Sequence, residues 1–238
     1  MKTDHFEGKS VLEHLKAARA KGALASAEIH GTEISGHQAA AADAARDTAV
    51  CLIVLWILFP AQPKLYFLFA AGLLIWKMGR SALLGWARLE RLHRLIEEER
   101  WEIEHEREQE KEELAALYQA KGLTGKLLDE VVTVLMADDN RLLHIMLEEE
   151  MGLALEVYEH PLKQSVGAGL GVAFATVLFA GGYFLFSPLV ATVLTVATAA
   201  FIVAKLEKNR CLEAVIWNLA VVAFTAGAVY FLKSIIFS

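Results

Sequence analysis

Apolar residues are concentrated in two long blocks, and this distribution most limits the folds that the chain can adopt. The first block contains the runs Ala49 to Phe59 and Leu65 to Leu84, and the second contains Ser165 to Ser187, Leu189 to Ala204 and Leu212 to Leu232. Hydrophobic residues make up 55% of the 238 residues, and the mean hydropathy is +0.39. Such a chain with a polar central segment is too apolar for an ordinary soluble protein. We therefore expect an all-α membrane protein.

The five apolar runs predict five transmembrane helices, two before the polar segment and three after it. Because about 20 residues are needed to cross about 30 Å of hydrocarbon, the first helix has to extend backward through QAAAADAARDT. This extension places Asp43 and Asp47 on one helix face at i,i+4. Carboxylates near a membrane are candidate functional groups. In the third helix, Gly167 and Gly171 form a GxxxG motif, which predicts close helix packing or dimerisation.

These runs divide the chain into four segments. They are a polar N-terminal segment (1–46), helices one and two (47–86), a polar insert (87–160) and helices three to five (161–238). Lys and Arg cluster before the first helix, after the second, and between 205 and 210, so the positive-inside rule places the N-terminus and the insert in the cytoplasm. The charged N-terminus has no apolar core typical of a signal peptide, which is consistent with a bacterial inner membrane.

The insert opens with an acidic run, EEERWEIEHEREQEKEE, from Glu97 to Glu113. This run is expected to form a helix that continues from the second span without a break. Five of its glutamates are spaced 3, 4, 4 and 3 residues apart and therefore lie on one face: Glu99, Glu102, Glu106, Glu110 and Glu113. Because like charges at this spacing repel, a bound cation is expected to neutralise them. The alternative is a solvated charged face paired through Arg100, Arg107 and Lys111.

Two further helices are expected in the insert. Lys121 to Leu123 ends the acidic helix, and Thr124 can cap the next one. Asp138 and Asp139 start a short third helix that Gly152 closes. Met146 and Glu150 share a face of that helix at i,i+4 and can complete a metal site, although Met146 has core packing as an alternative role.

Other candidate groups have weaker support. Glu28, His30, Glu33 and His37 are possible metal ligands, but Gly31 and Gly36 interrupt any helix there, so a loop beside the membrane is favoured. The net charge is −6 and most of the acidic residues lie in the insert, which argues against a nucleic-acid partner. Cys51 and Cys211 form no CxxC motif and indicate neither a disulfide framework nor a zinc site.

The five-helix arrangement and the insert, which ends in IMLEEEMGL, resemble the vacuolar iron transporter (VIT/CCC1) family over roughly residues 65 to 232. The family's two ExxE pairs correspond to Glu99 with Glu102 and Glu110 with Glu113, and its late Met and Glu correspond to Met146 and Glu150. The resemblance implies a three-helix metal-binding insert and a homodimer. It also implies export of Fe²⁺ or Mn²⁺ from the cytosol, in exchange for protons, by a protein that is not an enzyme and needs no cofactor.

The chain departs from the family pattern at two kinds of position. Leu147 stands where the family has a second methionine. The first span lacks the family's Asp-Gly-Leu motif, and the second span lacks the family's glutamate. Ala70 or Ala71 stands near the position of that glutamate. Met78 approximates a family methionine, with Lys77 beside it. Asp43, Asp47 and Met78 are therefore the candidate transport pathway of this chain.

Carboxylate oxygens with a thioether favour Fe²⁺ and its first-row neighbours over Mg²⁺ or Ca²⁺. The leading hypothesis is a transporter of Fe²⁺ or Mn²⁺ that lies in a lipid bilayer and captures metal with the insert. The missing span carboxylates motivate an alternative, a membrane-anchored iron buffer or sensor. A ferritin-type di-iron oxidase is the third hypothesis. Within the acidic run its ExxH motif occurs only as Glu102 and His105, and His105 points away from the glutamate stripe.

Overall fold

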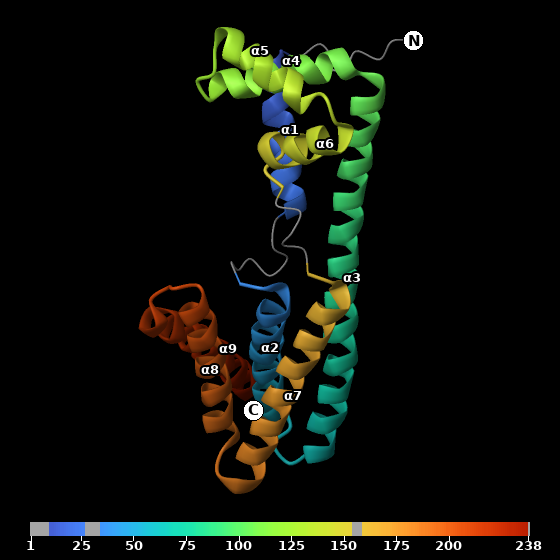
Figure 1. Cartoon of the computed structure of the whole chain (residues 1–238). Coiled ribbons are helices and arrows are strands. Elements are labelled where there is room, and N and C mark those ends of the chain that lie inside the picture. The colour runs from blue at the N-terminus through green and yellow to red at the C-terminus, as the bar shows by residue number, and fades with distance from the viewer. Residues whose placement is uncertain (1–9, 27–33, 154–158, 238) are drawn as a thin grey trace. The chain divides into compact units, whose positions relative to one another are not determined.

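The computed structural model describes residues 10–26, 34–153 and 159–237, and these residues form helices without strands (Figure 1). They divide into two compact units. The acidic unit consists of Met1–Ala27 and Ala87–Tyr158, and the apolar unit consists of Glu28–Trp86 and Glu159–Ser238. Helix α3, Pro63–His105, contributes residues to both. The division into four segments at 46, 86 and 160 stays a prediction.

The apolar unit contains α2 (Gly36–Leu58), the first part of α3, α7 (Pro161–Leu185), α8 (Pro188–Leu206) and α9 (Cys211–Ile236). Proline begins α3, α7 and α8, where its missing N–H costs nothing and its fixed φ suits a helix. Helix α2 packs against α7, α8 and α9 (Figure 1). Most of its buried positions are alanine, so the neighbouring backbones approach closely.

The GxxxG motif of α7 is part of this packing. A Cβ atom at Gly167 would lie 2.1 Å from the His37 carbonyl oxygen, and one at Gly171 would lie 2.0 Å from the Ala41 carbonyl oxygen. Neither distance is possible for a real side chain, so only glycine fits at these two positions. The predicted close packing is confirmed, and the partner is α2 of the same chain.

Four described helices are long and apolar enough to cross a membrane: α3, α7, α8 and α9. These helices support an integral membrane protein. Helix α2, the first predicted span, does not meet the same test. It has 23 residues, so every 18-residue window in it includes Asp43, Arg46 and Asp47. Composition and length therefore support four of the five predicted spans. That α2 is the fifth span stays a prediction.

The acidic unit contains α1 (Val11–Ser26), the end of α3, α4 (Arg107–Ala120), α5 (Gly125–Leu135), α6 (Asp139–Ile145) and the π-helical turn η1 (Met146–Glu150). Gly122, at φ +97°, follows α4, and Gly152, at φ +68°, follows η1. These left-handed positions favour glycine. The carboxylate of Asp138 caps α6 by accepting from the Arg141 N–H at 2.8 Å. The predicted ends at Lys121 to Leu123, Asp138 and Gly152 are confirmed, whereas Thr124 lies at the N-cap position of α5 without a side-chain capping hydrogen bond.

A buried apolar cluster holds the acidic unit together. It is formed by α1, α3, α4, α5, α6, η1 and the residues after η1: Ala18, Leu92, Leu95, Ile103, Leu114, Val132, Leu142, Leu143, Met146, Leu147, Met151 and Leu153. Burial of these side chains provides the main stabilisation. The glutamates described next lie on the same helices, so the cluster determines where their carboxylates are held.

Candidate metal centre in the acidic unit

The acidic run does not form one straight helix. Helix α3 ends at His105 and α4 begins at Arg107, with Glu106 between them at φ −124° and ψ 36°. The expectation of an unbroken helix from the second span through the acidic run is therefore wrong. No proline or glycine marks the break, and every residue around it is compatible with a helix. The chain turns because the apolar residues on both sides of the break, such as Ile103 and Leu114, enter one core.

The break creates the first group of carboxylates. On a straight helix Glu99 and Glu110 would be about 16 Å apart along the axis, because each residue rises about 1.5 Å. In the bent chain Glu99, Glu102 and Glu110 each offer one carboxylate oxygen, and these oxygens all lie within 4.8 Å of one another. Two residues of α3 and one of α4 thus meet at one point.

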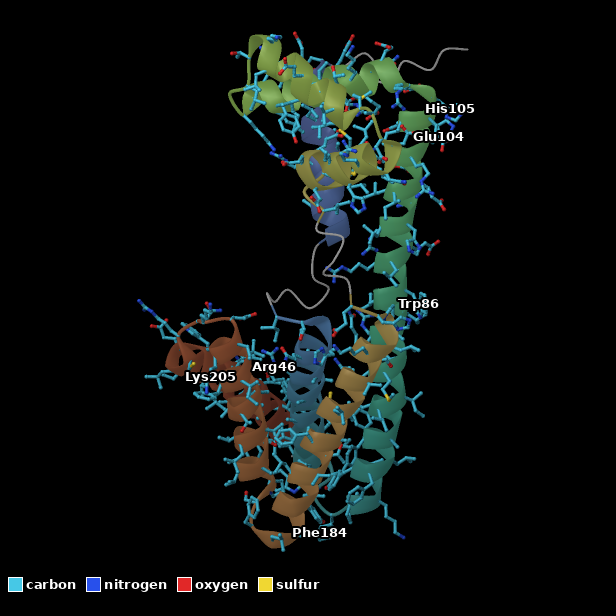
Figure 2. The ribbon with its side chains drawn as sticks, in the orientation of Figure 1. Arg46, Trp86, Glu104, His105, Phe184 and Lys205 are labelled. Carbon is cyan, nitrogen blue, oxygen red and sulfur yellow. The ribbon has the colours of Figure 1, made fainter. Side chains whose placement is uncertain are left out.

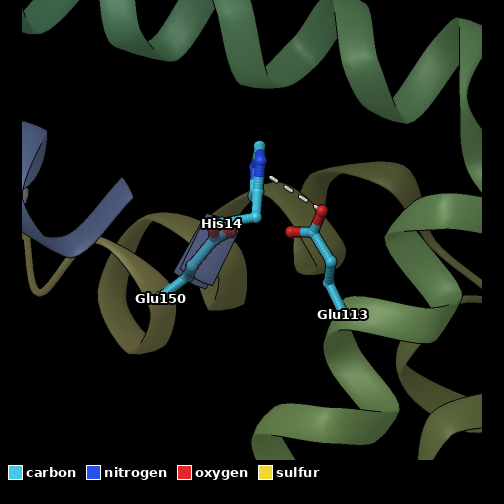
Figure 3. A group of neighbouring side chains, drawn as sticks. All are labelled: His14, Glu113 and Glu150. Carbon is cyan, nitrogen blue, oxygen red and sulfur yellow. Dashed lines mark ion pairs between the residues drawn. The ribbon is translucent and has the colours of Figure 1, made fainter. Parts of the chain in front are cut away.

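A second group joins three separate elements. His14 of α1, Glu113 of α4 and Glu150 of η1 each offer one ligand atom within 4.8 Å of the others (Figure 3). The Nε2 atom of His14 lies 3.5 Å from Oε1 of Glu113. The sequence analysis did not identify His14. A signal was present, since His14, Ala18 and Gly22 follow one another at i,i+4 on one face of α1.

Burial separates these glutamates from ordinary surface acids. Glu99, Glu110 and Glu113 are each 1% exposed, and Glu150 is 3% exposed. The alternative of a solvated charged face is therefore wrong for the three of these residues that belong to the acidic run, Glu99, Glu110 and Glu113. Arg107 does not serve them either, because it bonds to Asp139 at 2.7 Å and to the Met136 carbonyl.

Burial also changes the protonation of the site. Desolvation, together with the nearby charges of Glu99 and Glu113, raises the pKa of Glu110 to about 11. The same causes raise the pKa of Glu150 to about 10. In the metal-free protein these two carboxyls therefore hold protons at neutral pH. A divalent cation can displace those protons and take the freed oxygens as ligands.

Two predicted ligands have other surroundings. Met146 is fully buried in the apolar cluster, and Glu106 occupies the N-cap position of α4 at the break. Glu106 is not among the described groups of His and carboxylate ligands. Their roles as metal ligands, like those of the other predicted residues, stay predictions.

The oxidase hypothesis depends on His105, which lies elsewhere. Its ring stacks on Trp101 with 4.6 Å between the ring centroids, and its Nδ1 lies 2.9 Å from the Trp101 carbonyl oxygen. Figure 2 shows His105 on the outer side of α3. It contributes to neither carboxylate group, so the Glu102–His105 pair does not form a di-iron ligand set in this arrangement.

A comparison with protein families identifies the family of this chain. The model of the VIT family matches residues 86–234, which is more than half of the chain. The chain belongs to the VIT family. No curated protein and no solved structure matches it. The VIT match includes Glu99, Glu110, Glu113 and Glu150, whereas α1 and α2 lie outside the matched range.

The candidate pathway residues of the apolar unit are not brought together as one site. Asp47 pairs with Nζ of Lys77, which also lies 3.7 Å from the Asp43 carboxylate. The two aspartates line a cavity of about 330 Å³ between α2, α8 and α9, together with Arg46, which donates to Asn218 at 3.2 Å. The sulfur of Met78 faces Gly169 of α7 instead.

Cations lie close to both aspartates. Arg46 lines the cavity with them, and Lys77 pairs with both carboxylates, so these cations reduce the attraction of the aspartates for a divalent metal. The VIT-family resemblance predicted a pathway near these positions. In this structure Lys77 pairs with both carboxylates, and their role in a transport pathway stays a prediction.

Of the candidate ligands near the N-terminus, only His37 lies in the described part of the chain, and there it pairs with Glu159. Nδ1 of His37 and its backbone N–H both lie 2.6 Å from the Glu159 carboxylate, which Lys163 also contacts. Burial would raise the pKa of Glu159, but the hydrogen bonds from Lys163 and His37 hold it below its ordinary value. His37 thus anchors the start of α2. Glu28, His30 and Glu33 lie outside the described residues.

Proposed function

We propose that this VIT-family chain is a transporter of Fe²⁺ or Mn²⁺ whose acidic unit captures the ion. The observation that carries the proposal is the convergence of four nearly water-free glutamates on two adjacent groups of ligand atoms. Carboxylates gathered this closely repel one another, and a divalent cation bound among them offsets that repulsion. The family match and the four apolar helices support a membrane metal transporter.

The direction and coupling follow from charge. Basic residues cluster on the acidic-unit side of the predicted spans, so the proposal places this unit in the cytosol of a bacterial inner membrane and makes the transporter an exporter. Protons held by Glu110 and Glu150 leave when metal binds. This exchange is a physical route to proton antiport. The proposal includes a homodimer, as the family resemblance implies. It assigns the chain no catalytic reaction.

A second candidate function is a membrane-anchored metal buffer or sensor. The observation that favours it is the ion pair between Asp47 and Lys77, which places an ammonium group beside the predicted pathway carboxylates. In this alternative the acidic unit binds metal, and the apolar unit anchors the protein without conducting ions.

Metal flux into proteoliposomes distinguishes the two functions. The protein is reconstituted with a metal-quenched dye inside the vesicles, and Fe²⁺ or Mn²⁺ is added outside. The wild type is compared with Glu102→Ala/Glu113→Ala and with a control, Glu108→Ala/Glu112→Ala, which changes two exposed glutamates of α4.

Flux that falls in the first variant but not in the control establishes a transporter supplied by the acidic unit. No flux with metal still bound establishes the buffer or sensor. Absence of metal binding by the wild type refutes both functions.

A further inference from the structure

The position of α1 is determined by close contacts that do not involve the glutamates. A Cβ atom at Gly22 would lie 2.0 Å from the Met151 carbonyl oxygen, so α1 touches the backbone that follows η1. Ala18 is buried in the apolar cluster, and Arg19 donates to the Glu149 carbonyl oxygen at 2.9 Å. These contacts hold α1 against η1 at a distance that only small residues permit.

The same face of α1 carries His14, one turn before Ala18. Close packing at Ala18 and Gly22 brings the imidazole to the carboxylates of Glu113 and Glu150 (Figure 3). Glu113 and Glu150 are buried and the His14 side chain is 18% exposed, so the three ligand atoms meet in a largely buried place. One nitrogen and two carboxylate oxygens are a donor set that suits a first-row divalent metal.

We propose that His14 is the nitrogen ligand of a second metal position, formed with Glu113 and Glu150 beside the group of Glu99, Glu102 and Glu110. The inference rests on the proposed function, because it requires that the acidic unit binds metal. His14 lies outside the range matched by the family model.

Two consequences follow from a nitrogen ligand on α1. Metal at this position joins α1, α4 and η1, so metal binding stabilises the docking of the N-terminal helix. An imidazole also suits Fe²⁺ better than Mg²⁺ or Ca²⁺, which prefer oxygen ligands only. The second position therefore makes the acidic unit more selective for transition metals than its carboxylates alone would.

The competing explanation is a simple ion pair between His14 and Glu113. In that case the imidazole carries a proton on the nitrogen that faces Glu113, and that nitrogen does not bind metal. A method that detects the bond between metal and nitrogen separates the two explanations.

The experiment uses the full-length protein in detergent with Mn²⁺ as the paramagnetic probe. Electron spin-echo envelope modulation reports imidazole nitrogen bound to Mn²⁺. The wild type is expected to show this modulation. His14→Gln is expected to lose it together with one bound Mn²⁺ equivalent, while the carboxylate group on α3 and α4 retains its ion. His144→Gln, which changes an exposed histidine of α6, serves as the control and is expected to behave like the wild type.

A second variant tests the inference without changing a ligand. Gly22→Ala places a Cβ against the Met151 carbonyl and moves α1 away from η1. It is expected to abolish the nitrogen modulation although His14 is still present, and circular dichroism confirms that the helices are retained.

The outcomes are distinguishable from failure of the proposed function. Nitrogen modulation that persists in His14→Gln overturns the inference, as does Mn²⁺ binding to the wild type without any nitrogen modulation. In both cases the proposed function stands. Absence of Mn²⁺ binding to the wild type overturns the proposed function and this inference with it.

Discussion

Replacing Glu110 by glutamine is expected to stabilise the metal-free protein and to weaken its metal binding. Glu110 is 1% exposed, and burial raises its pKa from 4.5 to about 11. At about pH 7 the unfolded chain has an ionised carboxylate at this position, whereas the folded chain has a protonated one. Each pKa unit is worth about 1.36 kcal/mol, so taking up this proton costs on the order of 3 kcal/mol at about pH 7.

The cost of taking up the proton is set by the difference between the pH and the pKa of the unfolded chain. The pKa in the folded protein has little influence on this cost when it lies well above neutral pH. Glutamine has nearly the same shape and no proton to acquire, so it removes the cost. The variant is expected to gain up to about 3 kcal/mol at about pH 7. The gain is absent near the ordinary pKa of 4.5 and grows as the pH rises, because the wild type loses about 1.4 kcal/mol per pH unit between the two pKa values.

The assay is thermal unfolding of the full chain in detergent with a chelator, from about pH 5 to about pH 8. Glu112→Gln, on an exposed position of the same helix, is the matched control. Added Mn²⁺ is expected to raise the unfolding midpoint of the wild type more than that of Glu110→Gln, since a ligand has been removed. A variant that is less stable than the wild type at about pH 7 refutes the reasoning, as does a gain that is equal at every pH.

Three further predictions concern the site and the membrane helices. Mn²⁺ affinity is expected to fall as the pH drops from about 7 to about 5, because protons on the buried glutamates compete with the metal; a flat affinity profile by calorimetric titration contradicts this. Gly171→Ala is expected to cost about 1–3 kcal/mol, because its Cβ would lie 2.0 Å from the Ala41 carbonyl oxygen, whereas Gly181→Ala, in open space, leaves the unfolding midpoint unchanged. Lys77→Met is expected to lower the unfolding midpoint, because Asp47 then lacks its cation, and adding Asp47→Asn is expected to restore the midpoint. A double variant as unstable as the single one shows that the pair does not stabilise the fold.

Local sequence patterns were sufficient for the class of protein and for most helix ends. Runs of apolar residues identify four membrane helices because length and composition alone decide whether a helix can cross a bilayer. Gly122, Asp138 and Gly152 mark helix ends because the backbone conformation or capping bond required there involves only near neighbours. The GxxxG motif of α7 likewise predicted close packing, since glycine removes the side chain that would prevent it.

The glutamates of the site were also predictable as a set, because helical spacing makes such a pattern visible. Their geometry was not. The turn at Glu106 has no local signal, and it occurs because residues on both sides are buried in one core. Without this turn Glu99 and Glu110 would be about 16 Å apart, so a straight acidic helix could not form the group observed.

Sequence alone thus determined which helices the chain can form. They are apolar helices suited to a bilayer and, between them, a segment rich in carboxylates. Only the tertiary structure decided which of these groups meet. His14 and Glu150 are far apart in the chain, and Lys77 and Asp47 belong to different helices, so neither pair has a spacing that a periodic pattern can reveal. Their meeting depends on how closely neighbouring backbones approach, which is set by small residues such as Gly22 and by packing of the whole core.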